Sequence, residues 1–228
     1  MHVRIKIGIF HRLFRRRAEE PAGTPPAQAH APLASLIYTV FDTETTGMRP
    51  SNGDEIVAIG AVRISGGRMV MEQSFDRLVN PGRAIPPAST RVHGIDDRMV
   101  QGAPPIAAVL PEFFGFARGT VLVAHNAAFD MKFLQLREAA AGVRFAMPVL
   151  DTLVLSEVAH PHSDEHSLEA IAARLGVDVA ARHTAIGDAR VTGEIFLRLL
   201  PLLAAKGITT LEQALAASKK TYFAKVKY

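Results

Sequence analysis

Short apolar runs alternate with helical patterns along residues 36–203. The runs are bounded by Gly, Pro or polar residues and predict strands, the first of them buried on both faces. The predicted strands are Leu36–Phe41, Glu55–Ile64, Met69–Val79, Thr120–Ala124 and Pro148–Leu150. Gly66 and Gly67 join the second strand to the third, which predicts an antiparallel hairpin.

Apolar residues with helical spacing fill most of the remaining segments. They predict helices at Pro104–Arg118, Ala127–Ala140, Ser167–Leu175 and Thr184–Leu200, with a further helix beginning at Thr152. Gly176 and Pro201 are the expected ends of the last two helices. The mixture predicts an α/β domain whose sheet is flanked by helices.

The two ends of the chain differ from this middle part. Residues 1–17 mix apolar and basic side chains and read as a basic arm. This arm is either a poorly ordered terminus or a segment that docks on a membrane surface or a partner. Residues 18–35 contain six Ala and four Pro, which predicts a linker. The folded domain is therefore expected over 36–203, followed at 204–228 by a short helix and a basic tail.

Charge is unevenly distributed, although the whole chain has a formal net charge of +4. Residues 1–35 and 204–228 each carry +4, whereas residues 36–203 carry −4. This distribution excludes a uniformly basic nucleic-acid-binding protein and leaves an acidic excess to be explained. The absence of Cys excludes disulfides and thiolate metal sites. No apolar run reaches the roughly 20 residues of a membrane span, so we expect no transmembrane segment and a cytoplasmic location.

Asp42 and Glu44 follow the first buried strand in the segment VFDTETTG. Because a strand points residues i and i+2 to one face, both carboxylates should converge while Thr43 faces away. Adjacent carboxylates repel each other unless a cation compensates them, and their oxygen atoms suit Mg²⁺ or Mn²⁺. A solvated strand end is the alternative, which the apolar run before Asp42 disfavours.

Three more candidates lie further along the chain. Asp130, in HNAAFD, falls in the first turn of a predicted helix, where a partner of the helix dipole is the simpler interpretation. Asp188, in HTAIGDA, shares a helix face with Val191 and Ile195 and therefore requires a partner such as a metal. His183 cannot share that face, so we expect it on the preceding loop. There it either lies close to the acidic residues or is an ordinary exposed surface residue.

Three segments in this order resemble the DEDDh family of 3′–5′ exonucleases, the group that contains the proofreading epsilon subunit of bacterial DNA polymerase III. They are VFDTETTG (40–47), VLVAHNAAFDMKFL (121–134) and HTAIGDA (183–189). VHGIDD (92–97) and HSLEAIAARLGV (166–177) are also similar to segments of that family. The resemblance implies a ribonuclease H-like fold with a mixed five-stranded sheet. No clear sliding-clamp motif of the epsilon type is found, since the segment from Gln213 is a poor match.

The resemblance also implies roles for individual residues. Four acids would hold two Mg²⁺ or Mn²⁺ ions: Asp42, Glu44, Asp130 and Asp188. His183 would be the general base. Residues beside them would contact the substrate, with turn formation as the alternative for the first three: Thr45, Thr46, His93 and Asn126. The implied substrate is a nucleic acid with a free 3′ end, and the implied products are nucleoside 5′-monophosphates. A DNA polymerase subunit is a candidate partner.

Three functions stay open at this stage. A DNA exonuclease is favoured because DTETTG is closer to the epsilon group than to oligoribonucleases. An RNA-trimming enzyme of the same family would use the same five residues. A catalytically silent nucleic-acid-binding module is disfavoured because all five chemical positions are filled. A zinc site at His160, His162 and His166 is also conceivable, but their polar surroundings favour an ordinary loop.

Overall fold

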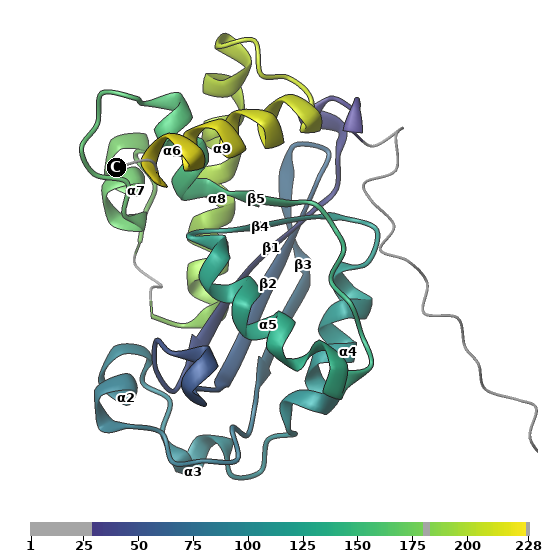
Figure 1. Ribbon diagram of the computed structural model, residues 1–228, viewed down its shortest axis with the longest axis vertical. Coiled ribbons are helices and arrows are strands. Elements are labelled where there is room, and N and C mark those ends of the chain that lie inside the picture. Colours follow the sequence, from purple (N-terminus) through teal and green to yellow (C-terminus); the bar gives the residue numbers. More distant parts are fainter. Residues whose placement is uncertain (1–28, 180–182, 227–228) are drawn as a thin grey trace, which may run out of the picture.

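The computed structural model describes residues 29–179 and 183–226, so the predicted basic arm and most of the predicted linker lie outside the described residues. A five-stranded sheet in the order β3-β2-β1-β4-β5 forms its centre (Figure 1). The strands are β1 (Tyr38–Thr45), β2 (Ile56–Ser65), β3 (Arg68–Leu78), β4 (Val121–Ala124) and β5 (Val149–Asp151). All five are predicted strands, with ends shifted by a few residues.

The sheet is mixed, as expected. β1 pairs antiparallel with β2 and parallel with β4, and β5 continues the parallel half. Helices cover both faces (Figure 1). The helical segments are η1 (Leu33–Ser35), η2 (Pro50–Asn52), α2 (Pro87–His93), α3 (Asp97–Val100), α4 (Ile106–Ala117), α5 (Ala127–Ala141), α6 (Thr152–Ala159), α7 (Leu168–Leu175), α8 (Ala185–Ala205) and α9 (Leu211–Val226).

Successive residues of β1 face two separate apolar layers. Val40 is fully buried in the layer that contains α6, α7 and α8, and Phe41 is fully buried in the layer that contains α4 and α5. In the second layer the Phe113 ring centroid lies 5.4 Å from that of Phe41 and 5.7 Å from that of Phe145. Each such side chain contributes about 2–3 kcal/mol of burial energy. The strand is therefore fixed from both sides up to the point where its acidic residues begin.

The folded body extends beyond the boundaries that composition suggested. Leu33, inside the predicted linker, is 4% exposed, and its N–H donates to the Thr209 carbonyl at 2.8 Å. Leu211 and Ala214, inside the predicted tail, are fully buried. Apolar residues on both flanks cover the same end of the molecule, so the last residues of the linker and the start of the tail belong to the domain.

α8 corrects another expectation, because the helix does not end at Pro201. It continues to Ala205, with Pro201 exposed inside it. A proline inside a helix costs about 3 kcal/mol. Leu199 and Leu203 are both fully buried on either side, and burying two such side chains offsets a cost of that size. Core packing therefore decides where this helix ends.

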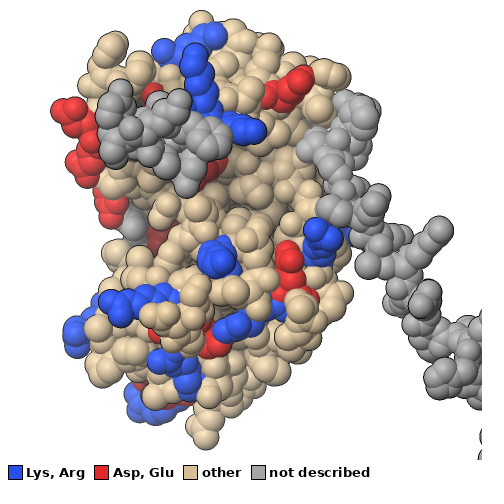
Figure 2. Space-filling model, viewed as in Figure 1, with Lys and Arg blue, Asp and Glu red and all other residues tan. Residues whose placement is uncertain are grey.

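Charged side chains are dispersed over the face shown in Figure 2. Lys and Arg occupy several separate places on that face, with Asp and Glu between them. This view agrees with the exclusion of a uniformly basic binding protein.

Candidate active site

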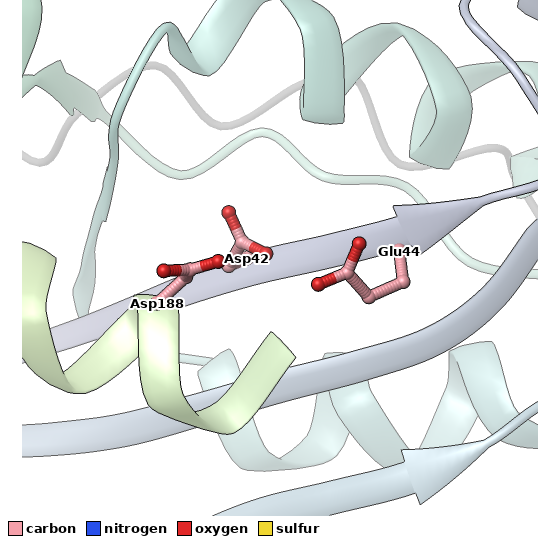
Figure 3. Close-up of side chains that lie close together, drawn as sticks. All are labelled: Asp42, Glu44 and Asp188. Carbon is pink, nitrogen blue, oxygen red and sulfur yellow. The ribbon is translucent and has the colours of Figure 1, made fainter. Parts of the chain in front are cut away.

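Three carboxylates meet at the C-terminal end of β1. Asp42 and Glu44 come from β1 and Asp188 comes from the first turn of α8 (Figure 3). One ligand oxygen from each lies within 4.8 Å of the others. Asp188 is 7% exposed, and the two strand residues are half-buried. As the alternation of β1 predicts, Asp42 and Glu44 share a face and Thr43 points to the other.

A glycine allows α8 to reach this face of the sheet. Gly60 of β2 lies opposite Asp42 in the strand register. A Cβ atom at Gly60 would lie 2.1 Å from the backbone N of Ile186 and 2.2 Å from the backbone C of Ala185. The first turn of α8 thus rests directly on the backbone of β2. This contact places Asp188 beside Asp42, and no pattern in the sequence predicted it.

The start of α8 is fixed by its own cap. The Thr184 hydroxyl accepts the N–H of Gly187 at 3.1 Å. The N–H of His183 donates to Oδ2 of Asp188 at 3.2 Å, and His183 has a positive φ of 65°. His183 lies on the loop before the helix, as predicted, and is exposed. The loop that carries the imidazole is therefore tied to one of the three carboxylates.

Asp130 differs from the other three predicted acids. It lies on α5, which packs on the opposite face of the sheet, and it is not part of the three-carboxylate group. Its Oδ1 accepts the N–H of Thr43 at 3.0 Å and the Thr43 hydroxyl at 2.6 Å. Burial raises the pKa of Asp130 to about 7, and the two bonds from Thr43 oppose that rise. The structure therefore links Asp130 to the other acids through the residue between them in β1.

Asp151 accepts hydrogen bonds from the starts of two helices, and the sequence did not identify it as a candidate residue. One of its oxygens accepts the N–H of Asn126 at 2.9 Å and that of Leu153 at 3.0 Å. The other accepts the N–H of Ala127 at 2.9 Å. A single carboxylate at the end of β5 thus caps both α5 and α6. Burial raises the pKa of Asp151, and these donors oppose the rise. An Asp directly before the predicted helix at Thr152 was the available signal.

The predicted substrate-contacting threonines are engaged in their own loop. The Thr45 hydroxyl donates to the Gly47 carbonyl at 2.7 Å. The Thr46 hydroxyl accepts the N–H of Glu55 at 3.0 Å and lies 3.3 Å from Oδ1 of Asp54. Both threonines are buried. Their side chains shape the turn after Glu44, which is the alternative that the sequence left open.

His93 also supports this loop. Its Nδ1 accepts the N–H of Ile95 at 3.1 Å, so the proton of a neutral ring lies on Nε2, which is 3.2 Å from the Thr45 carbonyl. Burial lowers the pKa of His93, which favours this neutral form. His93 ends α2 and is 6% exposed. Neither α2 nor α3 was predicted from the sequence.

Asn126 and the loop histidines complete the set of candidates. Asn126 is exposed at the start of α5 in a left-handed conformation with φ of 56°. His166 has both ring nitrogens engaged, Nδ1 with the Ser156 hydroxyl at 2.9 Å and Nε2 with the Ser163 carbonyl at 3.0 Å. Within the described residues His160, His162 and His166 do not converge as metal ligands. The ordinary-loop interpretation is therefore the better one.

The sequence profile of the family described as Exonuclease matches residues 39–196, which is more than half of the chain. The chain belongs to the exonuclease family. The resemblance drawn from three short segments is thereby confirmed. A DNA polymerase III subunit epsilon-like protein of Rhodobacter capsulatus is 54% identical over 200 residues, 87% of this chain. A DNA polymerase III of the PolC type from Caldanaerobacter subterraneus is 40% identical over 176 residues, 77% of this chain.

These relatives are much longer than the exonuclease chain. It spans 28% of the Rhodobacter capsulatus protein and 12% of the Caldanaerobacter polymerase. Among solved structures, Exonuclease X in complex with 5′ overhanging duplex DNA is similar, with a TM-score of 0.62 and 26% identity over 79% of this chain and 99% of that one. The nuclease domain of 3′hExo, a DEDDh family member bound to rAMP, has a TM-score of 0.65 and 18% identity over 75% and 94%. The predicted ribonuclease H-like fold is confirmed.

The acidic cluster suits a divalent cation. Three carboxylates within 4.8 Å would repel one another without a positive charge between them. Oxygen-only ligand sets of this kind favour Mg²⁺ or Mn²⁺ over softer metals. Within the described part of the chain, no helix is long and apolar enough to cross a membrane.

Proposed function

We propose that this chain hydrolyses DNA from a free 3′ end and releases nucleoside 5′-monophosphates. The observation that carries the proposal is the convergence of Asp42, Glu44 and Asp188 at the end of a buried strand, in a chain of the exonuclease family. An acidic site of this kind also accounts for the excess negative charge of residues 36–203.

Asp42, Glu44 and Asp188 would hold Mg²⁺ or Mn²⁺, and Asp130 would complete a site for two ions. When bound, such cations supply the positive charge that activates water and stabilises the phosphate and the leaving oxygen. The protein's own contribution is rigidity. β1 is buried on both faces up to Asp42, and α8 rests on Gly60, so the carboxylates need little rearrangement.

His183 would accept the proton of the attacking water. Imidazole is suited to proton transfer near neutral pH. The bond from the His183 N–H to Asp188 keeps the loop next to the carboxylates. The residue itself is exposed to solvent. Asn126 and the backbone of Thr45 and Thr46 would contact the terminal nucleotide, because the threonine side chains are already engaged within the loop.

DNA is the favoured substrate. The epsilon-like and PolC-type relatives are named as parts of DNA polymerase III, and the similar Exonuclease X structure contains duplex DNA. Trimming of RNA is the second candidate, because the bound rAMP in the 3′hExo structure shows that this fold also accepts a ribonucleotide. From the epsilon-like and PolC-type relatives we infer that this chain acts beside a DNA polymerase, in the cytoplasm.

A degradation assay tests this function. The protein is incubated with Mg²⁺ or Mn²⁺ and three end-labelled substrates: single-stranded DNA, duplex DNA with a frayed 3′ end, and short RNA. We expect stepwise shortening of DNA from its 3′ end, abolished in Asp42→Ala. Glu72→Ala is the matched control, since Glu72 is an exposed acid on the edge strand β3 and its loss should change nothing. Faster degradation of RNA would favour the second candidate, and no degradation of any substrate would exclude an enzyme.

A further inference from the structure

Thr43 and Asp130 are joined by two hydrogen bonds in the interior of the protein. Two donors of Thr43, its N–H and its hydroxyl, converge on the same oxygen of Asp130. Asp130 is 3% exposed and Thr43 is 6% exposed, so both groups are shielded from water. The hydroxyl bond of 2.6 Å lies at the short end of the range for O–H···O hydrogen bonds.

Strand topology explains why the N–H of Thr43 is available. The parallel ladder between β1 and β4 ends at the pair Val40 and Val123. β4 then stops at Ala124 and the chain turns into α5. Beyond Val40, the edge of β1 on that side has no strand partner in the ladder. The carboxylate of Asp130, one turn into α5, takes the place that a longer β4 would occupy.

Thr43 therefore lies between the three-carboxylate cluster on one face of β1 and Asp130 on the other. Its neighbours Asp42 and Glu44 point to one face and belong to the three-carboxylate cluster. Its own side chain points to the other face and holds Asp130. Outer-sphere partners of this kind orient metal ligands, and their loss typically weakens metal binding 10- to 100-fold.

We propose that Thr43 is a positioning residue that fixes Asp130 relative to Asp42 and Glu44 and thereby sets the affinity of the site for divalent cations. One oxygen of Asp130 accepts both donors of Thr43, which restricts rotation of the carboxylate. The inference rests on the proposed metal-dependent function, but it concerns binding of the ion and is measured without any nucleic acid.

Binding of Mn²⁺ alone tests the proposal. The dissociation constant of the metal-free protein for Mn²⁺ is measured by electron paramagnetic resonance of the free ion, and binding that persists in Asp42→Ala is subtracted. We expect Thr43→Val, which keeps the shape but removes the hydroxyl, to weaken Mn²⁺ binding about tenfold. Thr43→Ser should restore binding to within about twofold, because it restores the donor.

The matched control is Thr39→Val. Thr39 is a fully buried threonine on the same strand and the same face, and its hydroxyl bonds Thr120 at 2.8 Å and Arg63 at 2.6 Å. Its loss should lower the unfolding temperature and leave Mn²⁺ affinity unchanged. A parallel fall in affinity would show that any buried hydroxyl of β1 has the same effect, and that result would overturn the positioning role.

A double-mutant cycle isolates the path through Asp130. In an Asp130→Asn background, the substitution Thr43→Val should cause no further loss of Mn²⁺ affinity. An undiminished effect in that background, or unchanged affinity in the single variant, contradicts the proposal. Thr43→Ala serves if the valine variant does not fold, and lack of Mn²⁺ binding by the wild type also overturns the inference. Wild-type protein that binds Mn²⁺ but degrades no DNA would refute the proposed function and leave the role of Thr43 standing.

Discussion

Asp42 and Gly60 lie opposite each other in the β1–β2 register, and the backbone of α8 occupies the space where a side chain at Gly60 would be. The helix that carries Asp188 can approach the sheet only because that position has no Cβ atom. A residue with no functional group is thus responsible for bringing the third carboxylate to the first two.

Gly60→Ala should therefore damage both folding and the site. The new Cβ atom would lie 2.1 Å from a backbone nitrogen, so the start of α8 must shift. Overpacking of this kind costs on the order of 2–3 kcal/mol of unfolding free energy. We expect at least a tenfold loss of exonuclease activity, measured beside denaturant unfolding. Gly115→Ala is the control, since Gly115 has open space around it inside α4 and alanine should stabilise that helix.

His183→Asn tests the general base. Asn tolerates the left-handed conformation that His183 adopts, so the N–H bond to Asp188 should survive. Removal of the imidazole should lower kcat by about 10²–10⁴ and flatten the acidic limb of the pH–rate profile. His162→Asn, on an exposed loop, is the control and should leave the profile intact. An unchanged profile in the His183 variant would remove the proton-transfer role.

The raised pKa of Asp130 predicts a pH dependence of stability in metal-free protein. The folded protein holds this proton up to about pH 7, whereas the unfolded chain releases it near pH 4. The stabilisation is therefore complete below about pH 4 and is lost as the pH rises to about 7. Asp130→Asn, which stays neutral, should gain stability relative to the wild type across that range, on the order of 2–4 kcal/mol by pH 8. Denaturant unfolding in EDTA between pH 4 and 8 measures the difference in unfolding free energy between the variant and the wild type. A difference that does not change with pH contradicts the raised pKa of Asp130.

Asp151→Ala should destabilise the fold more than an ordinary cap variant does. It removes one carboxylate that accepts three N–H groups at the starts of α5 and α6. We expect a loss of about 2–4 kcal/mol of unfolding free energy, and a clearly smaller loss for Asp96→Ala at the cap of the short α3. Thermal unfolding of both variants at one pH gives the comparison, and equal losses would mean that Asp151 serves a single helix.

Local patterns were sufficient to predict the five strands and the shared face of Asp42 and Glu44. Alternation along one strand dictates which residues point together, and this information is contained in a few neighbouring residues. The spacing of HTAIGDA likewise placed His183 on a loop. These features depend on the chain within one element, so sequence was enough.

Contacts between distant elements were not predictable in the same way. Gly60 reads as a weak strand residue until the backbone of α8 is seen against it. Asp130 reads as a helix-dipole partner until β4 ends early and leaves the N–H of Thr43 to it. Pro201 reads as a helix end until Leu199 and Leu203 are found buried around it. Each depends on a partner far away in sequence.

The hydrogen bond between Leu33 and Thr209 has a mechanical consequence. Together with the bridge between Pro32 and Thr210, it ties the two flanks of the body at the start of β1, and the carboxylates lie at the other end of that strand. A strand of this length separates the two points by about 20–25 Å. Tension applied between residue 32 and residue 210 would fall on these contacts before it reached the sheet. The domain can thus be tethered on both sides without deforming its acidic end.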